Sequence, residues 1–278
     1  MRHLIASLVV LLTISIASGA EIDYPKSIDI VSGKLEVRLG AATYWNIDRV
    51  IYDKLAVSTD AKGYWGTVFQ FPEIGFVGSG HNDKGNSEKV IELKMFADDK
   101  YLSPEDVVKS GKIKCNEFRL EKQAQVMDIV FNYCLIIKND QLIESCRMKA
   151  AKDTPLKLMY NFMHPWSEKM TDYYIQIKDN DDKQGEFKTD EKFPHQGKFK
   201  WISLYDKNIQ AGIVSKATGD DISCFLWDRK NYKKVYLCAF YRKTMIAGQE
   251  TSHTMTTAFF KSTPTDWIKT AKELADKL

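Results

Sequence analysis

The sequence predicts an all-β fold, a large antiparallel β-sandwich with few short helices and a C-terminal helix. Short runs rich in Val, Ile, Tyr, Phe, Trp and Thr alternate with turns rich in Gly, Asp, Asn and Lys along the chain. Almost no helical pattern lies between successive runs, which favours antiparallel pairing over a parallel β-α-β arrangement. The runs outnumber the strands that one sheet holds comfortably, so we expect stacked sheets.

The expected strands follow one another with tight turns. In chain order they are 27–31, 34–39, 44–51, 65–71, 88–97, 113–120, 125–137, 142–150, 156–164, 172–178, 186–189, 198–205, 209–215, 222–227, 233–241 and 253–261. The clearest hairpin joins 125–137 to 142–150 through Lys-Asn-Asp-Gln. The polar stretch 179–185 is typical of a hairpin loop and is a weak match to a calcium loop.

Two helices are expected. Ser103 is a suitable N-cap, Pro104 suits the first helical position, acidic residues follow in the first turn, and Gly111 ends the segment. The second helix covers 265–278, where an apolar stripe predicts packing on the outside of the sandwich. The stripe consists of Ile268, Ala271, Leu274, Ala275 and Leu278.

Composition indicates a folded, water-soluble protein. The 278 residues are 44% hydrophobic and 28% charged, which is enough apolar material for a core. The formal net charge of +3 comes from mixed signs without a basic stripe, so we expect no nucleic-acid partner. No linker and no internal repeat divides the chain, and residues 21–278 are expected to form a single domain.

The first twenty residues are typical of a secretory signal peptide. Arg2 precedes the charge-free run 4–16, and Ser18, Gly19 and Ala20 are the small residues that a signal peptidase requires. The run is about 13 residues long, short of the roughly 20 that span a bilayer. We therefore expect cleavage after Ala20 and a mature protein in the periplasm or outside the cell, without a membrane span.

The odd number of cysteines leaves at least one thiol unpaired. They are Cys115, Cys134, Cys146, Cys224 and Cys238. Each lies singly in an apolar run without zinc-ligand spacing, which favours buried free thiols. A two-residue turn at 139–140 would place Cys134 opposite residue 145, whereas a three-residue loop would place it opposite Cys146. The register of this hairpin decides whether those two thiols can bond.

Aromatic residues beside amide, acid and guanidinium groups are candidates for sugar binding. Trp45 and Arg49 lie in Tyr44-Trp-Asn-Ile-Asp-Arg49, and Tyr64 follows in Gly-Tyr-Trp-Gly. A ring face stacks on a pyranose while planar polar groups bind its hydroxyls. The alternative is that strand alternation buries Trp45, Ile47 and Tyr64 in the core.

Two histidines are candidates for acid–base chemistry. Glycines at 75, 78 and 80 predict a pliable loop that carries His81, with Glu88 at the start of the next strand. The strand 156–164 ends in His164-Pro-Trp166, and the proline is expected to stop ladder pairing and place the imidazole at the sheet rim. The alternatives are a plain turn for His81 and backbone hydrogen bonds for His164.

Trp227 and Arg229 form a fourth candidate, because a guanidinium fork binds a carboxylate such as that of a uronic acid. A surface turn is the alternative.

The histidines are scattered singly, and neither a nucleophile elbow nor a zinc protease motif is present. We expect no metal and no cofactor.

Several segments, in their order, resemble a bacterial family of secreted β-supersandwich proteins, similar in architecture to galactose mutarotases and to the sandwich domains of polysaccharide lyases. They are Trp45-Asn-Ile-Asp-Arg49, Tyr64-Trp-Gly-Thr67, Gly78-Ser-Gly-His81 with Glu88, Phe162-Met-His-Pro-Trp166, Trp201 with Tyr205, Trp227-Asp-Arg229 and Asp266-Trp267. The resemblance implies a galactose mutarotase-like supersandwich. In mutarotases a histidine acid and a glutamate base act on the anomeric centre, and His164 is similar to that acid in its place. The sequence departs from mutarotases in lacking a His-Ser-Tyr-type motif and a base near the C-terminus.

The sequence therefore predicts a secreted protein that binds or processes a sugar or polysaccharide, as a lyase-like or epimerase-like enzyme or as a binding protein. In an enzyme, His164 and His81 would be catalytic, and Arg229, Trp45, Arg49, Tyr64, Trp166, Trp227 and Glu88 would bind substrate. The alternative is a noncatalytic envelope or scaffold protein. That alternative predicts that the tryptophans lie on inner sheet faces and that no concave surface joins His81, His164 and Arg229. The sequence leaves the oligomeric state open.

Overall fold

The computed structural model describes residues 24–59, 63–178, 181–219 and 221–278. The predicted signal peptide lies outside these residues, as do residues 179 and 180 of the predicted hairpin loop. The described residues form four sheets and two α-helices, α1 (Pro104–Ser110) and α2 (Trp267–Ala275), with short 3-10 turns at Ala41–Thr43 and Asp83–Gly85. Neither of the described helices is long and apolar enough to cross a membrane.

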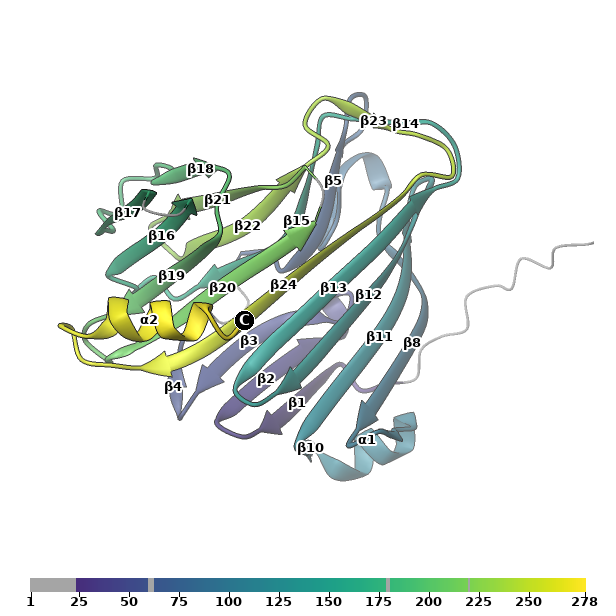
Figure 1. Cartoon of the computed structure of the whole chain (residues 1–278). Helices are drawn as coiled ribbons and strands as arrows, with labels where there is room; N and C mark the ends of the chain where they lie inside the picture. The colour runs from purple at the N-terminus through teal and green to yellow at the C-terminus, as the bar shows by residue number, and fades with distance from the viewer. Residues whose placement is uncertain (1–23, 60–62, 179–180, 220) are drawn as a thin grey trace, which may run out of the picture.

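The largest sheet has ten strands and is antiparallel throughout (Figure 1). In spatial order its strands are β17 (Asp181–Glu186), β16 (Asp172–Lys178), β19 (Trp201–Asp206), β20 (Ala211–Gly219), β24 (Glu250–Lys261), β13 (Gln141–Ala150), β12 (Ile129–Lys138), β11 (Glu117–Val126), β8 (Lys89–Ala97) and β9 (Lys100–Tyr101). Along β11 and β12 every second residue is buried, which gives this sheet one face toward the core.

Three smaller sheets complete the fold. The seven-stranded sheet is β18 (His195–Gly197), β21 (Ser223–Asp228), β22 (Lys233–Ala239), β15 (Leu158–Trp166), β5 (Gly66–Phe71), β6 (Gly75–Gly78) and β7 (His81–Asn82). The five-stranded sheet is β10 (Lys112–Lys114), β1 (Ser27–Ser32), β2 (Leu35–Gly40), β3 (Asn46–Tyr52) and β4 (Leu55–Ala56). A two-stranded sheet pairs β14 (Thr154–Leu156) with β23 (Lys243–Met245).

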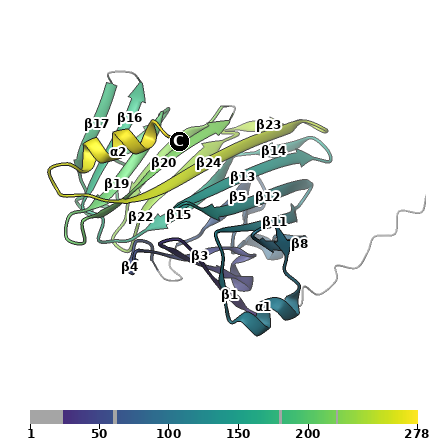
Figure 2. The same ribbon diagram turned by 60° about the horizontal axis from the view of Figure 1, so that its bottom comes forward.

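The seven-stranded and five-stranded sheets share one apolar core with the ten-stranded sheet (Figure 2). Phe69 of β5 lies 6.2 Å from Phe131 of β12, and Tyr52 of β3 lies 5.6 Å from Phe259 of β24, measured between ring centroids. Among the described strands only β1 and β10 pair in parallel. The prediction of a large antiparallel sandwich is confirmed, whereas its organisation as a single domain over 21–278 stays a prediction.

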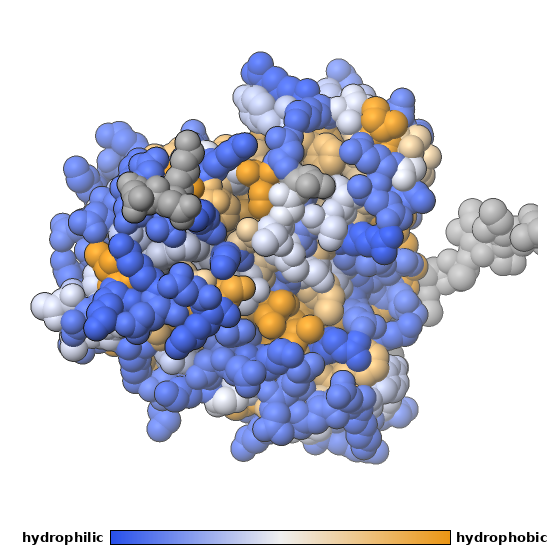
Figure 3. Space-filling view, in the orientation of Figure 1, coloured by the Kyte–Doolittle hydropathy of each residue, from blue (hydrophilic) through white to orange (hydrophobic). Residues whose placement is uncertain are grey.

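The outer face of the ten-stranded sheet is mostly polar. In the orientation of Figure 1 the surface is largely hydrophilic with small scattered hydrophobic patches (Figure 3). Helix α2 covers part of it, because Trp267 stacks on Tyr205 of β19 at 5.1 Å and its apolar neighbours pack on β20 and β24. The expected exterior position of the C-terminal helix is confirmed.

Helix α1 begins as its sequence predicts. The Ser103 side chain accepts a hydrogen bond from the Asp106 N–H at 3.2 Å, and the Asp106 carboxylate accepts one from the Ser103 N–H at 3.1 Å. This reciprocal capping box satisfies two N–H groups that the first helical turn leaves without partners.

The hairpin between β12 and β13 has a two-residue turn. Lys138 pairs with Gln141, and the turn residues Asn139 and Asp140 both have positive φ, 49° and 56°. Cys134 therefore lies opposite Ser145, and Cys146 lies on the other face of the sheet. All five cysteines are free; three of them, Cys146, Cys224 and Cys238, are buried.

Thiol labelling should reflect this burial. In native protein at pH 7 without reductant, we expect Cys146 and Cys224 to resist a thiol reagent, because burial raises the pKa of Cys146 to about 12 and excludes the reagent. After unfolding in denaturant, mass spectrometry should find five labelled thiols per chain. Fewer than five without reductant would reveal a disulfide and contradict the structure.

Four expected segments differ in the structure. Residues 181–185 of the predicted hairpin loop 179–185 are instead part of strand β17, which pairs with β16. The predicted strand 186–189 is wrong beyond Glu186, because the chain there turns so that the N–H groups of Lys188 and Thr189 donate to the Asp228 carboxylate. The predicted strand 113–120 breaks, because β10 joins the five-stranded sheet and β11 the ten-stranded sheet. The predicted glycine loop 75–81 is instead a hairpin of β6 and β7.

Candidate functional site

The outer face of the seven-stranded sheet carries an aromatic cluster of its own. Along β5, Phe69 points into the core, whereas Val68 points outward and packs with Met163 of β15 and Tyr236 of β22. Further side chains pack on these three from the neighbouring strands: Phe76, Tyr160, Phe225 and Trp227. This face is therefore lined with rings on the side away from the core.

A hollow of about 370 Å³ opens in this face. It is lined by Tyr64, Val68, Phe76, His81, Tyr160, Met163, Phe193, Trp227, Arg229, Tyr232, Lys234 and Tyr236. Tyr64 is 43% exposed and Phe193 39% exposed, and Phe193 stacks on Trp227 with ring centroids 5.1 Å apart. Exposed ring faces of this kind are suited to stacking on the apolar face of a sugar. We call this site the aromatic hollow.

Three basic side chains enter the aromatic hollow. The His81 ring lies 4.0 Å from the Tyr64 ring. The Arg229 guanidinium lies 4.3 Å above the Trp227 ring, and its Nε lies 2.8 Å from the Glu191 carboxylate. The third is Lys234, whose residue is only 6% exposed.

Lys234 lies among tyrosine rings. Its Nζ lies 5.8 Å from the ring centroid of Tyr64, 5.9 Å from that of Tyr232 and 5.7 Å from that of Tyr236. Burial, followed by the positive charge of Arg229, lowers the pKa of Lys234 to about 7. The side-chain amine of Lys234 is therefore only partly protonated near neutral pH.

Burial is also the main cause that lowers the pKa of His81. The charge of Lys234 adds to this lowering, and Asp83 opposes it. Two groups of the aromatic hollow therefore exchange protons at or below neutral pH, which general acid–base catalysis requires.

A buried ion pair holds the edge of the aromatic hollow in place. Asp228 at the end of β21 lies 2.5 Å from Lys233 at the start of β22, and both side chains are almost fully buried. The other carboxylate oxygen of Asp228 accepts from the N–H groups of Lys188 and Thr189, at 2.7 and 2.8 Å. These bonds fix the segment 187–194, which carries Phe193, against the β21–β22 turn.

The structure brings four of the nine predicted site residues together: His81, Tyr64, Trp227 and Arg229 all line the aromatic hollow. The other five lie elsewhere. Trp45 is buried edge-on to Tyr24, at 5.8 Å between ring centroids. Arg49 lies on the five-stranded sheet, 3.5 Å from Glu36 and 3.6 Å from Asp29.

Glu88 and Trp166 are interior residues. The Glu88 carboxylate lies 2.9 Å from Lys122 Nζ and accepts from the Ser79 N–H at 3.1 Å. Trp166 is fully buried and lies edge-on to Trp65, at 5.5 Å between ring centroids. Neither lines the aromatic hollow.

His164 does not lie at the sheet rim, and that prediction of its position is wrong. It is fully buried between the sheets, and its Nε2 lies 2.5 Å from the Glu144 carboxylate of β13. The Tyr133 hydroxyl donates to the other oxygen of Glu144 at 2.7 Å. Pro165 does not end the strand, because Pro165 and Trp166 still pair with β22.

A β-bulge in β15 explains this inward position. Asn161 pairs with Leu237 and His164 with Val235, so two residues, Phe162 and Met163, stand opposite one residue of β22. Uninterrupted alternation would put His164 on the face of Tyr160, which lines the aromatic hollow. The extra residue reverses the phase and turns the imidazole into the core.

Sequence reasoning missed Lys234, Tyr160, Phe193, Tyr232 and Tyr236. One signal could have found Lys234, because it lies directly across the β21–β22 hairpin from Trp227. With this register, Lys234 and Tyr236 share the face of Trp227. Phe193 comes from a distant irregular segment and has no such signal.

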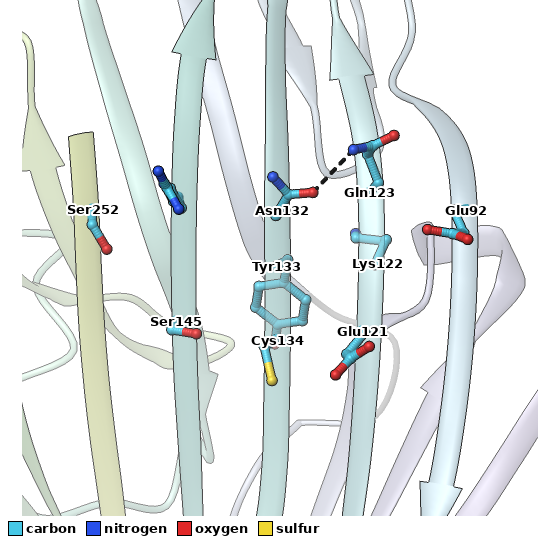
Figure 4. Close-up of a pocket in the computed structure, with 10 residues that line it drawn as sticks. Glu92, Glu121, Lys122, Gln123, Asn132, Tyr133, Cys134, Ser145 and Ser252 are labelled. Carbon is cyan, nitrogen blue, oxygen red and sulfur yellow. Dashed lines mark hydrogen bonds between the residues drawn. The ribbon is translucent and has the colours of Figure 1, made fainter. Parts of the chain in front are cut away.

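A second hollow, of about 430 Å³, lies on the ten-stranded sheet (Figure 4). It is lined by Glu92, Glu121, Lys122, Gln123, Asn132, Tyr133, Cys134, Ser145, Arg147 and Ser252. Its charges are largely paired with neighbours, as Glu92 is with Lys94 at 2.7 Å. Its one aromatic residue, Tyr133, is buried and bonded to Glu144. The aromatic hollow is therefore the better candidate for a sugar.

A third hollow, of about 610 Å³, continues the aromatic face. It is lined by Gln196, Gly197, Asp221, Ser223, Phe225, Cys238, Ala239, Tyr241 and Lys243. Phe225 lies between the two hollows, 6.3 Å from Tyr160 and 5.5 Å from Tyr236. Together the hollows extend along the outer face of β21 and β22.

In the described part of the chain, no three His, Cys, Asp or Glu side chains are grouped to hold a metal ion.

Comparison with solved structures identifies the fold. The Slr1438 protein from Synechocystis sp. PCC 6803 superposes with a TM-score of 0.57 at 9% identity, over 86% of this chain and 97% of that chain. Galactose 1-epimerase from Lactobacillus acidophilus NCFM superposes with a TM-score of 0.50 at 9% identity, over 84% of this chain and 93% of that chain. The GH36 α-galactosidase AgaB from Geobacillus stearothermophilus gives 0.52 at 8% identity, over 86% of this chain and 41% of that chain.

No protein-family model matches the sequence. No curated protein sequence matches it either. Sequence identities this low establish a shared architecture, but they do not show that the residues of a site are shared. The chain has the galactose mutarotase-like sandwich fold, as the resemblance of its motifs implies.

Proposed function

We propose that this protein is a secreted carbohydrate-binding or carbohydrate-processing protein whose sugar site is the aromatic hollow. One observation carries the proposal: exposed rings and three basic side chains converge in one hollow on the outer face of the seven-stranded sheet. The fold supports a carbohydrate-related role at the level of architecture, since galactose 1-epimerase shares it.

In this proposal the rings of Tyr64, Phe193 and Trp227 stack on the sugar, and His81 and Arg229 bind its hydroxyl or charged groups. The adjoining hollow around Phe225 and Tyr241 extends the same face, which favours a chain of several sugar units. His81 and Lys234 are the groups able to move a proton near neutral pH, as an epimerase or a lyase requires.

The noncatalytic scaffold is the alternative, and part of the structure is consistent with it. Trp45, Trp65 and Trp166 are buried, as that alternative predicts. His164 is buried too, so no hollow of the described residues joins His81, His164 and Arg229, which that alternative also predicts. Trp227 differs, because it lies on an outer face and shares a concave surface with His81 and Arg229. This arrangement favours a ligand site over a purely structural role for the aromatic residues.

Secretion is part of the proposal and rests on the sequence of residues 1–20. Expression of the full chain in a bacterium should yield mature protein outside the cytoplasm that begins at Glu21. N-terminal sequencing of the fractionated protein measures this. Full-length protein confined to the cytoplasm would contradict it.

Truncation of Trp227 should weaken sugar binding. We expect Trp227→Ala to lower the affinity for the saccharides that native protein binds by at least about tenfold, because it removes the ring that Phe193 and Arg229 hold in place. Titration calorimetry against a panel of neutral and acidic oligosaccharides measures the change.

Tyr101→Ala is the matched control, since Tyr101 is an exposed aromatic residue, 50% accessible, on β9 of the ten-stranded sheet. It should leave the affinity unchanged. If native protein binds no saccharide, or if Trp227→Ala binds as native protein does, the aromatic hollow is not a sugar site.

A further inference from the structure

Three lysines are buried among the described residues, and one of them has no acidic partner. Lys122 lies 2.9 Å from the Glu88 carboxylate, and Lys233 lies 2.5 Å from the Asp228 carboxylate. Within the described part of the chain, Lys234 has no ion pair, and the groups around its Nζ are tyrosine rings. An ammonium that is mostly buried without an anion is unfavourable, and Lys234 lines the aromatic hollow, where a ligand can supply the anion.

The surroundings of Lys234 add positive charge rather than negative charge. No Asp or Glu lines the aromatic hollow, whereas His81 and Arg229 both do. The nearest acid to Arg229, Glu191, lies 2.8 Å from its Nε and belongs to the segment at the rim. The hollow thus combines stacking surfaces with three basic groups, of which Arg229 has an acidic partner at the rim and Lys234 has none among the described residues.

We propose that the aromatic hollow binds a sugar that carries an anionic group, a carboxylate or a sulfate ester, with the Lys234 ammonium as its main counter-ion. This proposal rests on the proposed function and narrows it to acidic saccharides. Arg229 and His81 would approach the same anionic group from the β21–β22 turn and from β7. The cation–π contacts with the tyrosine rings hold the ammonium in position before the ligand arrives.

Binding of such a ligand depends on pH in a defined direction. Burial lowers the pKa of free Lys234 to about 7, and an anion beside it would raise that pKa. Affinity for the anionic ligand should therefore be highest below about pH 7, where Lys234 of the free protein is protonated. It should fall as pH rises further, and the fall should end above the higher pKa that Lys234 has in the complex. The other titratable or charged groups that face Lys234 are Arg229, His81, Tyr64, Tyr232 and Tyr236, and burial raises the pKa of the last two.

The test compares acidic and neutral ligands of equal length. Titration calorimetry at pH 6 uses galacturonate and glucuronate oligosaccharides, their neutral galactose and glucose counterparts, and sulfated galactose oligosaccharides. We expect native protein to prefer at least one acidic series by about tenfold or more. Comparing the affinities for the uronate series and the sulfated series shows which anionic group the protein prefers. A preference for either series over its neutral counterpart supports the proposal.

Two variants complete the test. Lys234→Met keeps the apolar stem of the side chain and should abolish the preference for acidic ligands over their neutral counterparts. Lys230→Met removes the same charge from an exposed lysine of the β21–β22 turn and should retain the preference. Native affinity for the acidic series should also fall between pH 6 and pH 9, and that of Lys234→Met should not.

A melting curve shows whether Lys234→Met is folded. The native pKa of Lys234 lies below its ordinary value of 10.5, so the unfolded chain binds this proton more tightly. The free energy of unfolding therefore falls as pH drops from 10.5 to about 7, and the full destabilisation is present below about pH 7. Lys234→Met should melt at or above the native temperature at pH 6. Equal affinity of native protein for acidic and neutral series, or a preference that survives in Lys234→Met, overturns the proposal. Absence of all saccharide binding overturns the proposed function itself.

Discussion

Replacement of Glu88 with alanine is expected to lower the free energy of unfolding by about 3–5 kcal/mol, because it leaves a buried ammonium without its anion. Lys122 Nζ would keep only the Tyr44 carbonyl at 2.8 Å and the Asn46 side-chain oxygen at 3.0 Å. Both partners of the ion pair are 1% exposed, so water cannot replace the carboxylate without opening the core. Urea unfolding at pH 7, followed by tryptophan fluorescence, measures the change.

Two variants control this experiment. Glu92→Ala removes a carboxylate from β8, the strand that begins directly after Glu88. Its pair with Lys94 is about half exposed, and the substitution should cost no more than about 1 kcal/mol. The double variant Glu88→Leu with Lys122→Met removes both charges and should recover much of the loss. If Glu88→Ala costs no more than Glu92→Ala, the interior pair is not a stabilising element.

Replacement of His164 with alanine is expected to lower the free energy of unfolding by about 2–4 kcal/mol. The imidazole is fully buried, lies 2.5 Å from Glu144 and contacts the rings of Trp65 and Trp166 at 5.1 and 5.3 Å between centroids. Its removal leaves a cavity and a buried carboxylate that keeps only the Tyr133 hydroxyl as a hydrogen-bond donor. Thermal and urea unfolding measure the loss of stability.

His81→Ala is the reciprocal variant, because His81 lines the aromatic hollow and is only partly buried. It should reduce saccharide binding or turnover and change the free energy of unfolding by less than about 1 kcal/mol. A catalytic role for His164 stays a prediction. Intact stability together with lost turnover in His164→Ala would support that role and would contradict the stabilising role assigned to it here.

Local signals in the sequence determined the architecture. Alternating burial along β11 and β12, the two-residue turn at 139–140 and the capping box at Ser103 each depend on neighbouring residues only. The apolar stripe of 265–278 likewise predicted that the last helix packs on a sheet. For the same reason the sequence could propose Tyr64, His81, Trp227 and Arg229, since aromatic and basic residues near turns are recognisable without knowing their neighbours.

The tertiary structure alone decided which candidates meet. The bulge in β15 reverses the alternation and sends His164 into the core, and a bulge leaves no distinct pattern in this sequence. Glu88 and Lys122 become an ion pair only because β8 and β11 are neighbours in the ten-stranded sheet. Among the described residues Lys234 has no acidic partner, because the fold places rings and basic groups around it. Charge pairing and burial depend on the contacts between distant segments, whereas periodicity depends on the covalent chain, so the sequence alone predicted the sheets better than the site.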